Sequence, residues 1–185
     1  MHKLLSCGCT CLALAALAVL SGCATPANQE AMMVSVSPNV ALSIPQELRG
    51  QVEVKDVVGG RETNPMLNSN ISSSAFDAAL RGSLRNAGLA AASPQAGRYL
   101  LSATIGNVQQ PFLGFDMTVT MTVDYDLIER ISNKTAWKTT VTRPYTAKAG
   151  DSFLGVERLR LANEGAARTN IEAFIEELTK SGPRK

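Results

Sequence analysis

The stretch Phe115–Leu127 (FDMTVTMTVDYDL) decides the fold, because apolar and polar residues alternate along its whole length. The odd-numbered positions carry Phe, Met, Val, Tyr and Leu, and the even-numbered positions carry only Thr and Asp. Successive side chains of a β-strand point to opposite faces of the sheet. The pattern therefore predicts a half-buried antiparallel strand with an apolar inner face and a Thr/Asp outer face.

The segments on either side of this stretch predict two more strands. Residues 99–105 alternate in the same way before it, and residues 137–145 alternate after it. Residues 115–127 and 137–145 form the two strands of a hairpin, and the odd-numbered residues form the inner face of both strands. Odd-numbered residues of one strand must therefore pair with odd-numbered residues of the other. A two-residue turn would instead place the apolar side chains of one strand on the outer face of the sheet. An odd-length loop around Asn133 is expected instead.

A helix is predicted over residues 72–87, where apolar residues recur at helical spacing and Gly88 supplies a stop. Ser74 and Asp77 have the spacing of a capping box at its start. Asp77 and Arg81 are four residues apart, which favours an ion pair on the exposed side.

A second helix is predicted at the end of the chain. Asp151 or Ser152 can cap its start, and it runs to about Ser181 before the sequence Gly-Pro. Asn163 and Asn170 interrupt its apolar stripe. Because an unpaired buried amide is costly, we expect both to bond neighbouring polar groups.

Two more strands are predicted near the start of the domain. Gln51–Val58 alternates before a Gly-Gly pair, and Val34–Ile44 alternates around Pro38, as an edge strand does. The fold class is thus α+β. Residues 33–182 form a single two-layer sandwich, a mostly antiparallel four- to five-stranded sheet with two helices on one face, in the order β-α-β-β-β-α.

The first 22 residues have the character of a secretion signal. Lys3 precedes an apolar run over residues 12–20, which is too short to span a membrane. The string ending in Cys23 resembles the bacterial lipobox, which implies a signal peptide over 1–22, an acylated Cys23 and a lipidated tether over 23–32. Ala24 after the Cys implies the outer membrane, facing the periplasm. An ordinary secretory signal with a chance Cys is the alternative.

Cleavage before Cys23 restricts the chemistry of the mature chain. The only His, His2, and three of the four Cys, at positions 7, 9 and 11, leave with the signal. A Ser-His-Asp triad, a Cys-His pair and His- or Cys-based zinc sites are then excluded. A net charge of +2 without a basic block gives no indication of nucleic acid. We expect no cofactor and no metal.

The predicted topology brings three loops to one end of the sheet, namely residues 59–70, 109–114 and 147–153. They carry the candidate residues for binding an envelope protein: Arg61, Glu62, Asn64, Phe112, Leu113, Asp151 and Phe153. Exposed apolar loop tips mark contact surfaces. Alternatively, the Phe side chains fold back over the core. The tether is expected to enter at the opposite end, so that these loops face the periplasm.

The chain resembles the YajG-type outer-membrane lipoproteins and, more distantly, the LptE-type lipopolysaccharide-assembly lipoproteins. Besides the lipobox and the order of elements, the resemblance is carried by Val36, Ser37, Pro38, Leu42, Pro45, Arg61 and Thr63. It implies a membrane-anchored envelope protein, and because the YajG-type family has no established activity, it implies no catalytic residue.

The leading hypothesis is a non-enzymatic binding or envelope-assembly lipoprotein. A lipid- or glycan-binding module is one alternative, with its ligand held between the sheet and Asn163 or Asn170. A carboxylate-dependent hydrolase is the other, because Asp124 and Asp126 lie about 7 Å apart on one strand face, a separation found in inverting glycosidases.

Overall fold

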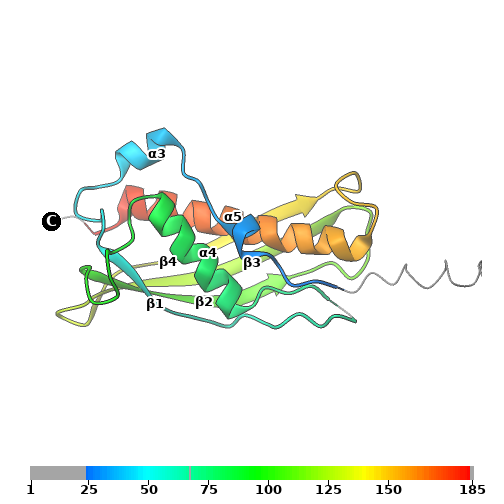
Figure 1. The fold of residues 1–185 in the computed structure, drawn as a ribbon, viewed down its shortest axis with the longest axis horizontal. Helices are drawn as coiled ribbons and strands as arrows, with labels where there is room; N and C mark the ends of the chain where they lie inside the picture. Colours follow the sequence, from blue (N-terminus) through cyan, green and yellow to red (C-terminus); the bar gives the residue numbers. More distant parts are fainter. Residues whose placement is uncertain (1–23, 67, 184–185) are drawn as a thin grey trace, which may run out of the picture.

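The computed structural model describes residues 24–66 and 68–183, so the predicted signal peptide and Cys23 lie outside the described residues. One layer is a four-stranded sheet in the order β1-β2-β3-β4 (Figure 1). β1 runs parallel to β2, and the other neighbours are antiparallel. The strands are β1 (Val52–Val58), β2 (Tyr99–Gln109), β3 (Met117–Glu129) and β4 (Lys134–Ala147).

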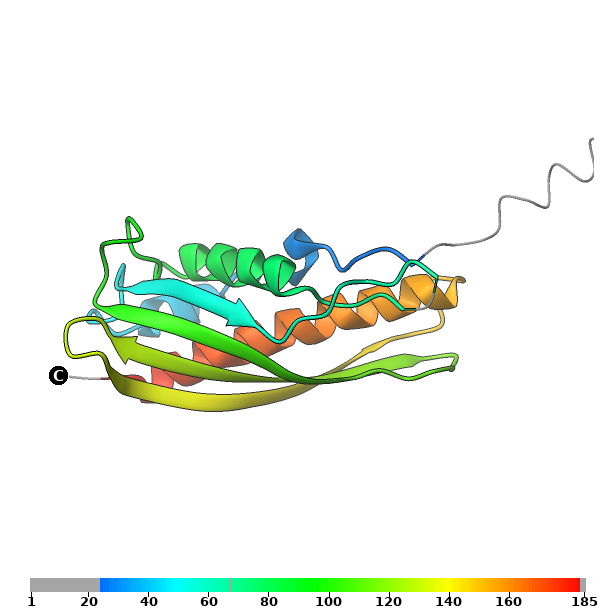
Figure 2. The same cartoon turned by 90° about the horizontal axis from the view of Figure 1, so that it is seen from below.

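The second layer is formed by two helices that lie on the same face of the sheet, α4 (Ser73–Asn86) and α5 (Gly155–Ser181). In Figure 2, α4 lies above the sheet and α5 runs along the strands. α4 packs on β1, and the longer α5 packs on β3 and β4. The predicted α+β class and two-layer architecture are confirmed. Among the described residues, no helix is long and apolar enough to cross a membrane.

The inner face of β3 forms the middle of the core, as the alternation predicts. Its odd-numbered residues from Met117 to Leu127 are all buried. The ring of Tyr125 stacks on Phe174 of α5, with centroids 4.1 Å apart. The Tyr125 hydroxyl donates to Oδ1 of Asn170, 2.9 Å away. The expectation that Asn170 bonds neighbouring polar groups is therefore confirmed, and burial raises the pKa of Tyr125 well above its ordinary value.

The β3–β4 hairpin has the predicted register but a different turn. Leu127 pairs with Trp137, so odd positions do lie opposite odd positions. Glu129, however, pairs with Lys134, which leaves a connection of residues 130–133. This loop has an even length, so the predicted odd-length loop is wrong. A register shift beside Leu127 supplies the extra residue and keeps the inward-facing residues of both strands on one side of the sheet.

The N-cap of α4 is Ser72, not Ser74 as the capping-box spacing suggested. The Ser72 hydroxyl accepts a hydrogen bond from the backbone N–H of Ala75, 3.2 Å away. Asp77, proposed as the other member of the box, instead accepts from Arg81 Nε at 2.8 Å. The predicted ion pair between these two residues is confirmed.

Replacing Ser72 with Ala is expected to lower the free energy of unfolding by about 1 kcal/mol, because one N–H of the first turn loses its acceptor. Urea denaturation measures the change. Ser74→Ala is the matched control, since the Ser74 hydroxyl contacts only that of Ser72. An equal loss in both variants would contradict the assignment of the cap to Ser72.

The N-terminal segment contains two short helices, α2 (Gln29–Met32) and α3 (Pro38–Ser43), where the sequence predicted an edge strand over Val34–Ile44. That prediction is wrong. Pro38 occupies the first turn of α3, where its fixed φ favours helix. The Ser37 hydroxyl accepts from Val40 N, which caps the helix.

Candidate binding site at the three-loop end

Three loops meet at one end of the molecule, on the right in Figure 1. They are residues 59–72 after β1, 110–116 between β2 and β3, and 148–154 between β4 and α5. We call this the three-loop end. The parallel pairing of β1 and β2 brings the first two loops together, as predicted. Residues of all three loops line one groove, which shows that they form a continuous surface.

The described chain begins at the same three-loop end. The backbone N–H of Ala24 donates to the carbonyl of Pro65 at 2.8 Å, and that of Ala27 donates to Asn70. The expectation that the tether enters at the opposite end is therefore wrong. Residues 24–32 also differ from a free tether, because Ala24, Ala27 and Met32 are buried. The segment runs back over α4 and α5 (Figure 2).

A buried carboxylate of α5 binds the N-terminal segment, residues 24–32, through a hydrogen bond. Glu164 Oε1 accepts from the backbone N–H of Asn28 at 2.8 Å, and it also accepts from Arg160. Only 4% of the Glu164 side chain is exposed. Arg160 bonds Glu157 as well, and this hydrogen bond lowers the pKa of the Glu157 carboxyl. The same bond, the largest cause, raises the pKa of Arg160.

The apolar side chains at the three-loop end point into solvent. Phe112 is 94% exposed and Phe153 is 101% exposed, so neither folds back over the core. We call the exposed apolar residues of the three loops the apolar crest. They are Met66, Phe112, Leu113, Phe115, Phe153 and Leu154.

Arg158 holds two of the crest loops together. Its Nη1 donates to the carbonyl of Ser152 at 2.6 Å, and its Nη2 donates to that of Gly114 at 3.4 Å. Asp116 adds a second link, because its Oδ1 accepts from Ala149 N at 2.9 Å. The crest is thus held by hydrogen bonds between loops.

Neither Asp151 nor Ser152 caps α5, which corrects the sequence prediction. The N-cap position belongs to Leu154, which forms no side-chain cap. Asp151 instead accepts from the backbone N–H of Lys148 at 2.8 Å within the loop. Its role is to shape the turn that presents Phe153.

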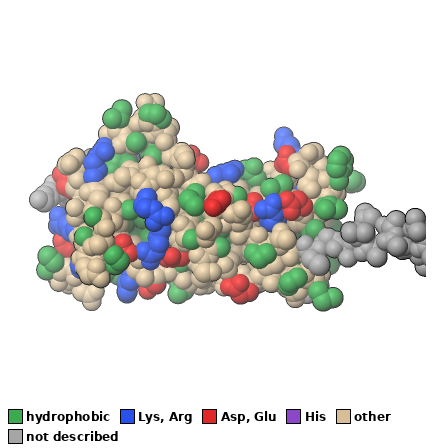
Figure 3. Space-filling model, in the orientation of Figure 1, with side chains coloured by type: hydrophobic (Ala, Val, Ile, Leu, Met, Phe, Trp, Pro, Cys, Tyr) green, Lys and Arg blue, Asp and Glu red, His purple; other side chains and the backbone are tan. Residues whose placement is uncertain are grey.

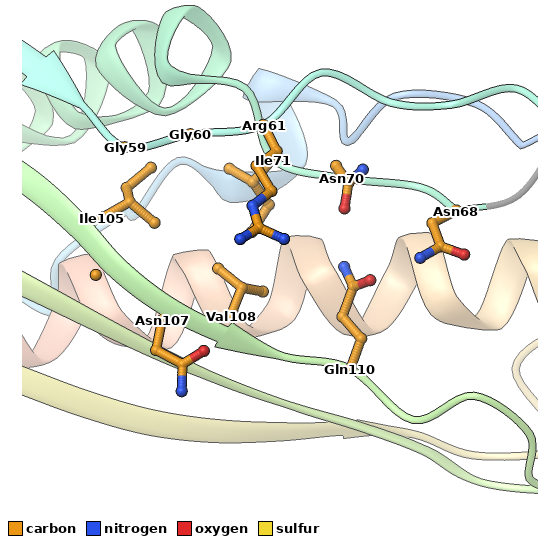
Figure 4. Close-up of a pocket in the computed structure, with 11 residues that line it drawn as sticks. Gly59, Gly60, Arg61, Asn68, Asn70, Ile71, Ile105, Asn107, Val108 and Gln110 are labelled. Carbon is orange, nitrogen blue, oxygen red and sulfur yellow. The ribbon is translucent and has the colours of Figure 1, made fainter.

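A polar cleft of about 160 Å³ lies beside the crest, between the first loop and the end of β2 (Figure 4). Gly59 begins the loop with φ +86°, and a Cβ there would lie 2.2 Å from the carbonyl of Ile105. Only Gly permits this approach. The polar side chains that line the cleft are Arg61, Asn68, Asn70 and Gln110, whereas that of Asn107 points away from it (Figure 4).

Arg61 is the charged group of this cleft. Its side chain extends from the loop toward β2, with the guanidinium between the two (Figure 4). Within residues 24–66 and 68–183, no hydrogen bond or ion pair of this guanidinium is found, whereas Gln110 donates to Asn163 Oδ1 at 2.8 Å and to Ser69 O. The arrangement offers one cation and several amides to an anionic group.

The other predicted polar residues lie outside the cleft. Asn64 accepts from the backbone N–H of Met66 at 3.0 Å and shapes the loop tip. Glu62 is exposed, and its carbonyl accepts from Asn70 Nδ2. Sequence analysis missed Asn68, Asn70 and Gln110, because amides in a loop and after a strand form no recognisable motif.

The two Asn residues of α5 are hydrogen-bonded within the protein. Asn163 donates to Ser69 O at 2.8 Å and accepts from Gln110. Asn170 accepts from Tyr125, and its Nδ2 donates to the carbonyls of Met121 and Val141. A lipid or glycan between the sheet and these amides would have to break bonds within the protein.

Asp124 and Asp126 line a shallow hollow with Lys138 on the outer face of the sheet. Asp124 is exposed, and its Oδ1 accepts from the Thr140 hydroxyl at 2.5 Å. The two carboxylates thus lie on an open, solvent-facing surface. In the part of the chain that the structure describes, no group of three or more His, Cys, Asp or Glu side chains could hold a metal ion.

No family model matches the chain, and no curated protein matches it. Solved structures do resemble it. A DUF330 protein from Xanthomonas campestris has a TM-score of 0.56 at 13% identity, with 75% of this chain and 90% of that chain covered. A PelC dodecamer from Paraburkholderia phytofirmans has a TM-score of 0.51 at 21% identity, covering 77% and 94%.

A minor lipoprotein from Acinetobacter baumannii has a TM-score of 0.50 at 11% identity, with 74% of this chain and 96% of that chain covered. At these identities the likeness shows the fold alone, and the resemblance to the YajG-type family stays a prediction. The chain shares its fold with bacterial proteins that include a lipoprotein.

Proposed function

We propose that the protein is a lipid-anchored, non-enzymatic envelope protein that binds a partner protein at the periplasmic face of the outer membrane. The lipobox-like string before Cys23 supports the anchor. The lipoprotein among the proteins of the same fold is consistent with it. The binding role rests on the polar cleft and on the absence of His and free Cys from the mature chain.

The observation that carries the binding role is the Arg61 guanidinium, which points into a cleft lined by amides (Figure 4). A planar guanidinium binds a carboxylate through two parallel hydrogen bonds. The amides of Asn68 and Asn70 lie on the loop side of the cleft and offer further donors. The cleft therefore suits an Asp, a Glu or a C-terminal carboxylate of the partner protein.

Photocrosslinking in cells tests this function. A benzoylphenylalanine in place of Asn68, which is exposed at the cleft, is expected to capture a defined envelope protein. The adduct should fall to near background in the Arg61→Gln variant, because the carboxylate loses its cation. Arg85→Gln is the matched control, since Arg85 is an exposed cation at the far end of α4.

The same probe at Ser132, in the hairpin at the opposite end of the sheet, controls for random collision. An adduct of twice the monomer mass would identify a second copy of this chain as the partner. An adduct that forms equally well at Ser132, or one that Arg61→Gln leaves unchanged, would contradict the cleft as the binding site.

A further inference from the structure

The apolar crest gathers most of the exposed apolar surface at one place. Nine large apolar side chains are exposed in the described part of the chain, and six of them belong to the three-loop end. Figure 3 shows apolar atoms gathered at this end. The crest exposures are Met66 92%, Phe112 94%, Leu113 81%, Phe115 87%, Phe153 101% and Leu154 50%. An apolar cluster of this kind marks a contact surface.

The position of Ala24 indicates what the crest contacts. Ala24 is hydrogen-bonded to Pro65, the residue before Met66 of the crest. Cys23 directly precedes Ala24, and consecutive Cα atoms lie about 3.8 Å apart. Acyl chains on Cys23 would therefore leave the protein beside the crest. They would place the surface of the bilayer against this end of the molecule.

We propose that the apolar crest inserts into the membrane that the lipid anchor holds, as a second, non-covalent contact with the bilayer. The proposal rests on the lipid anchor of the proposed function, but not on the partner at the polar cleft. Phe and Leu side chains lose contact with water when they enter the boundary between headgroups and acyl chains. The long axis of the domain then stands away from the membrane, with the β3–β4 hairpin farthest from it (Figure 1).

The polar groups of the same loops limit the depth of insertion. Lys148 N and Ala149 N donate to the carboxylates of Asp151 and Asp116, both of which are exposed. Irregular backbone and ionised groups are not stable in the hydrocarbon region. The crest therefore enters only the interfacial layer, with its carboxylates at the level of the headgroups.

A groove behind the crest gives acyl chains a surface to pack against. It has a volume of about 570 Å³, lies between the crest loops and the first turns of α5, and has mostly apolar walls. Met117, Leu154 and Leu159 contribute to these walls. The apolar walls of the groove continue the apolar surface of the crest toward α5.

Spin labels on the lipidated full chain in phosphatidylcholine vesicles test the proposal. The mature chain offers no free thiol, so single Cys substitutions at Phe112, Phe153 or Ser132 direct the nitroxide. We expect labels at Phe112 and Phe153 to collide with oxygen, which enters lipid, and to be shielded from a water-soluble nickel chelate. The label at Ser132, in the far hairpin, should show the opposite preference.

A second measurement removes the apolar groups themselves. A spin label at Leu113 reports the equilibrium between the membrane-inserted and the solvent-exposed crest. The double variant Phe112→Ser and Phe153→Ser should shift this equilibrium constant toward the solvent-exposed state by on the order of 100-fold. Its melting temperature should stay close to that of the parent, since both side chains are exposed. The double variant Lys134→Ser and Lys138→Ser at the far end controls for surface changes.

Each outcome has a distinct meaning. Intact-protein mass spectrometry without acyl groups on Cys23 would contradict the lipid anchor, and hence the proposed function. An acylated chain whose crest labels collide with nickel as often as the Ser132 label would overturn membrane insertion alone. A benzoylphenylalanine in place of Phe112 that captures a protein and no lipid would also overturn membrane insertion, and would assign the crest to that protein instead.

Discussion

Replacing Phe174 with Ala is expected to lower the free energy of unfolding by about 3–5 kcal/mol. Phe174 is fully buried where α5 meets the sheet, and its ring stacks on Tyr125 at 4.1 Å and lies 6.2 Å from Trp137. Truncation leaves a cavity between α5 and β3 and removes both aromatic contacts. Because domains are stable by only about 5–15 kcal/mol, this loss is a large fraction of the total.

Phe153→Ala is the matched control for this experiment. It removes the same atoms from a side chain that is fully exposed, so the expected change is within about 0.5 kcal/mol. Urea denaturation of both variants, with far-ultraviolet circular dichroism to show that helix content is kept, gives the comparison. Equal losses would mean that Phe153 packs in the core and that the apolar crest does not exist in solution.

The sheet and its two helices could be predicted from the sequence because their patterns are long. The alternation of Met117–Leu127 fixes one buried face, and the helical spacing in residues 72–87 does the same for α4. In both cases many residues agree on one orientation. Phe115, predicted to belong to that buried face, lies before β3 and is exposed, so this end of the prediction is wrong. The turns were predicted less well, because one residue decides them. The β3–β4 loop has four residues where an odd number was predicted, and the register shift at Leu127 compensates for the difference.

The N-terminal segment shows why short patterns mislead. Val34–Ile44 alternates weakly, but the local capping bond of Ser37 and the fixed φ of Pro38 favour helix α3. No property of this segment alone shows that it lies along α4 and α5. Its position depends on tertiary contacts, such as Val34 N with Ser83 Oγ at 2.9 Å, 49 residues away in the chain. The wrong prediction that the tether enters the domain opposite the three-loop end follows from this.

The candidate site was predicted in part for the same reason. The topology placed three loops at one end, and the exposed side chains of Phe112 and Phe153 lie there. The position of Arg61 in a cleft depends on the close approach of Gly59 to Ile105, which sequence spacing does not reveal. Gln110 reaches the cleft only because β2 ends beside the first loop.

Replacing Glu164 with Ala is expected to release the N-terminal segment and to lower the free energy of unfolding by about 2–3 kcal/mol. The substitution removes the acceptor of Asn28 N and leaves Arg160 without one of its two carboxylates. The loss stays below that of a fully buried pair, because Arg160 keeps Glu157 and is 20% exposed. Hydrogen exchange at the amide of Asn28 reports the release directly.

Two comparisons separate the causes of this loss. Glu164→Gln keeps an oxygen for the amide of Asn28 but loses the charge that pairs with Arg160, so Asn28 should stay protected from exchange while stability falls. Glu172→Ala removes an exposed carboxylate from the same helix and should change neither quantity. If the amide of Asn28 exchanges equally slowly in Glu164→Ala and in the parent protein, contacts other than the Glu164 carboxylate hold the N-terminal segment on α5.

The Glu164→Ala variant also tests how the anchor and the apolar crest act together. Residues 24–28 that come free can extend by about 3.3–3.6 Å each, which adds on the order of 17 Å between Cys23 and the domain. A crest that is merely held near the membrane by a short anchor would then move into water. A crest that inserts through its own apolar surface should keep the spin label at Phe112 shielded from nickel, because its contact with lipid is independent of the length of the tether. Shielding that persists in Glu164→Ala and disappears only when Phe112 and Phe153 are changed would therefore separate membrane insertion from tethering.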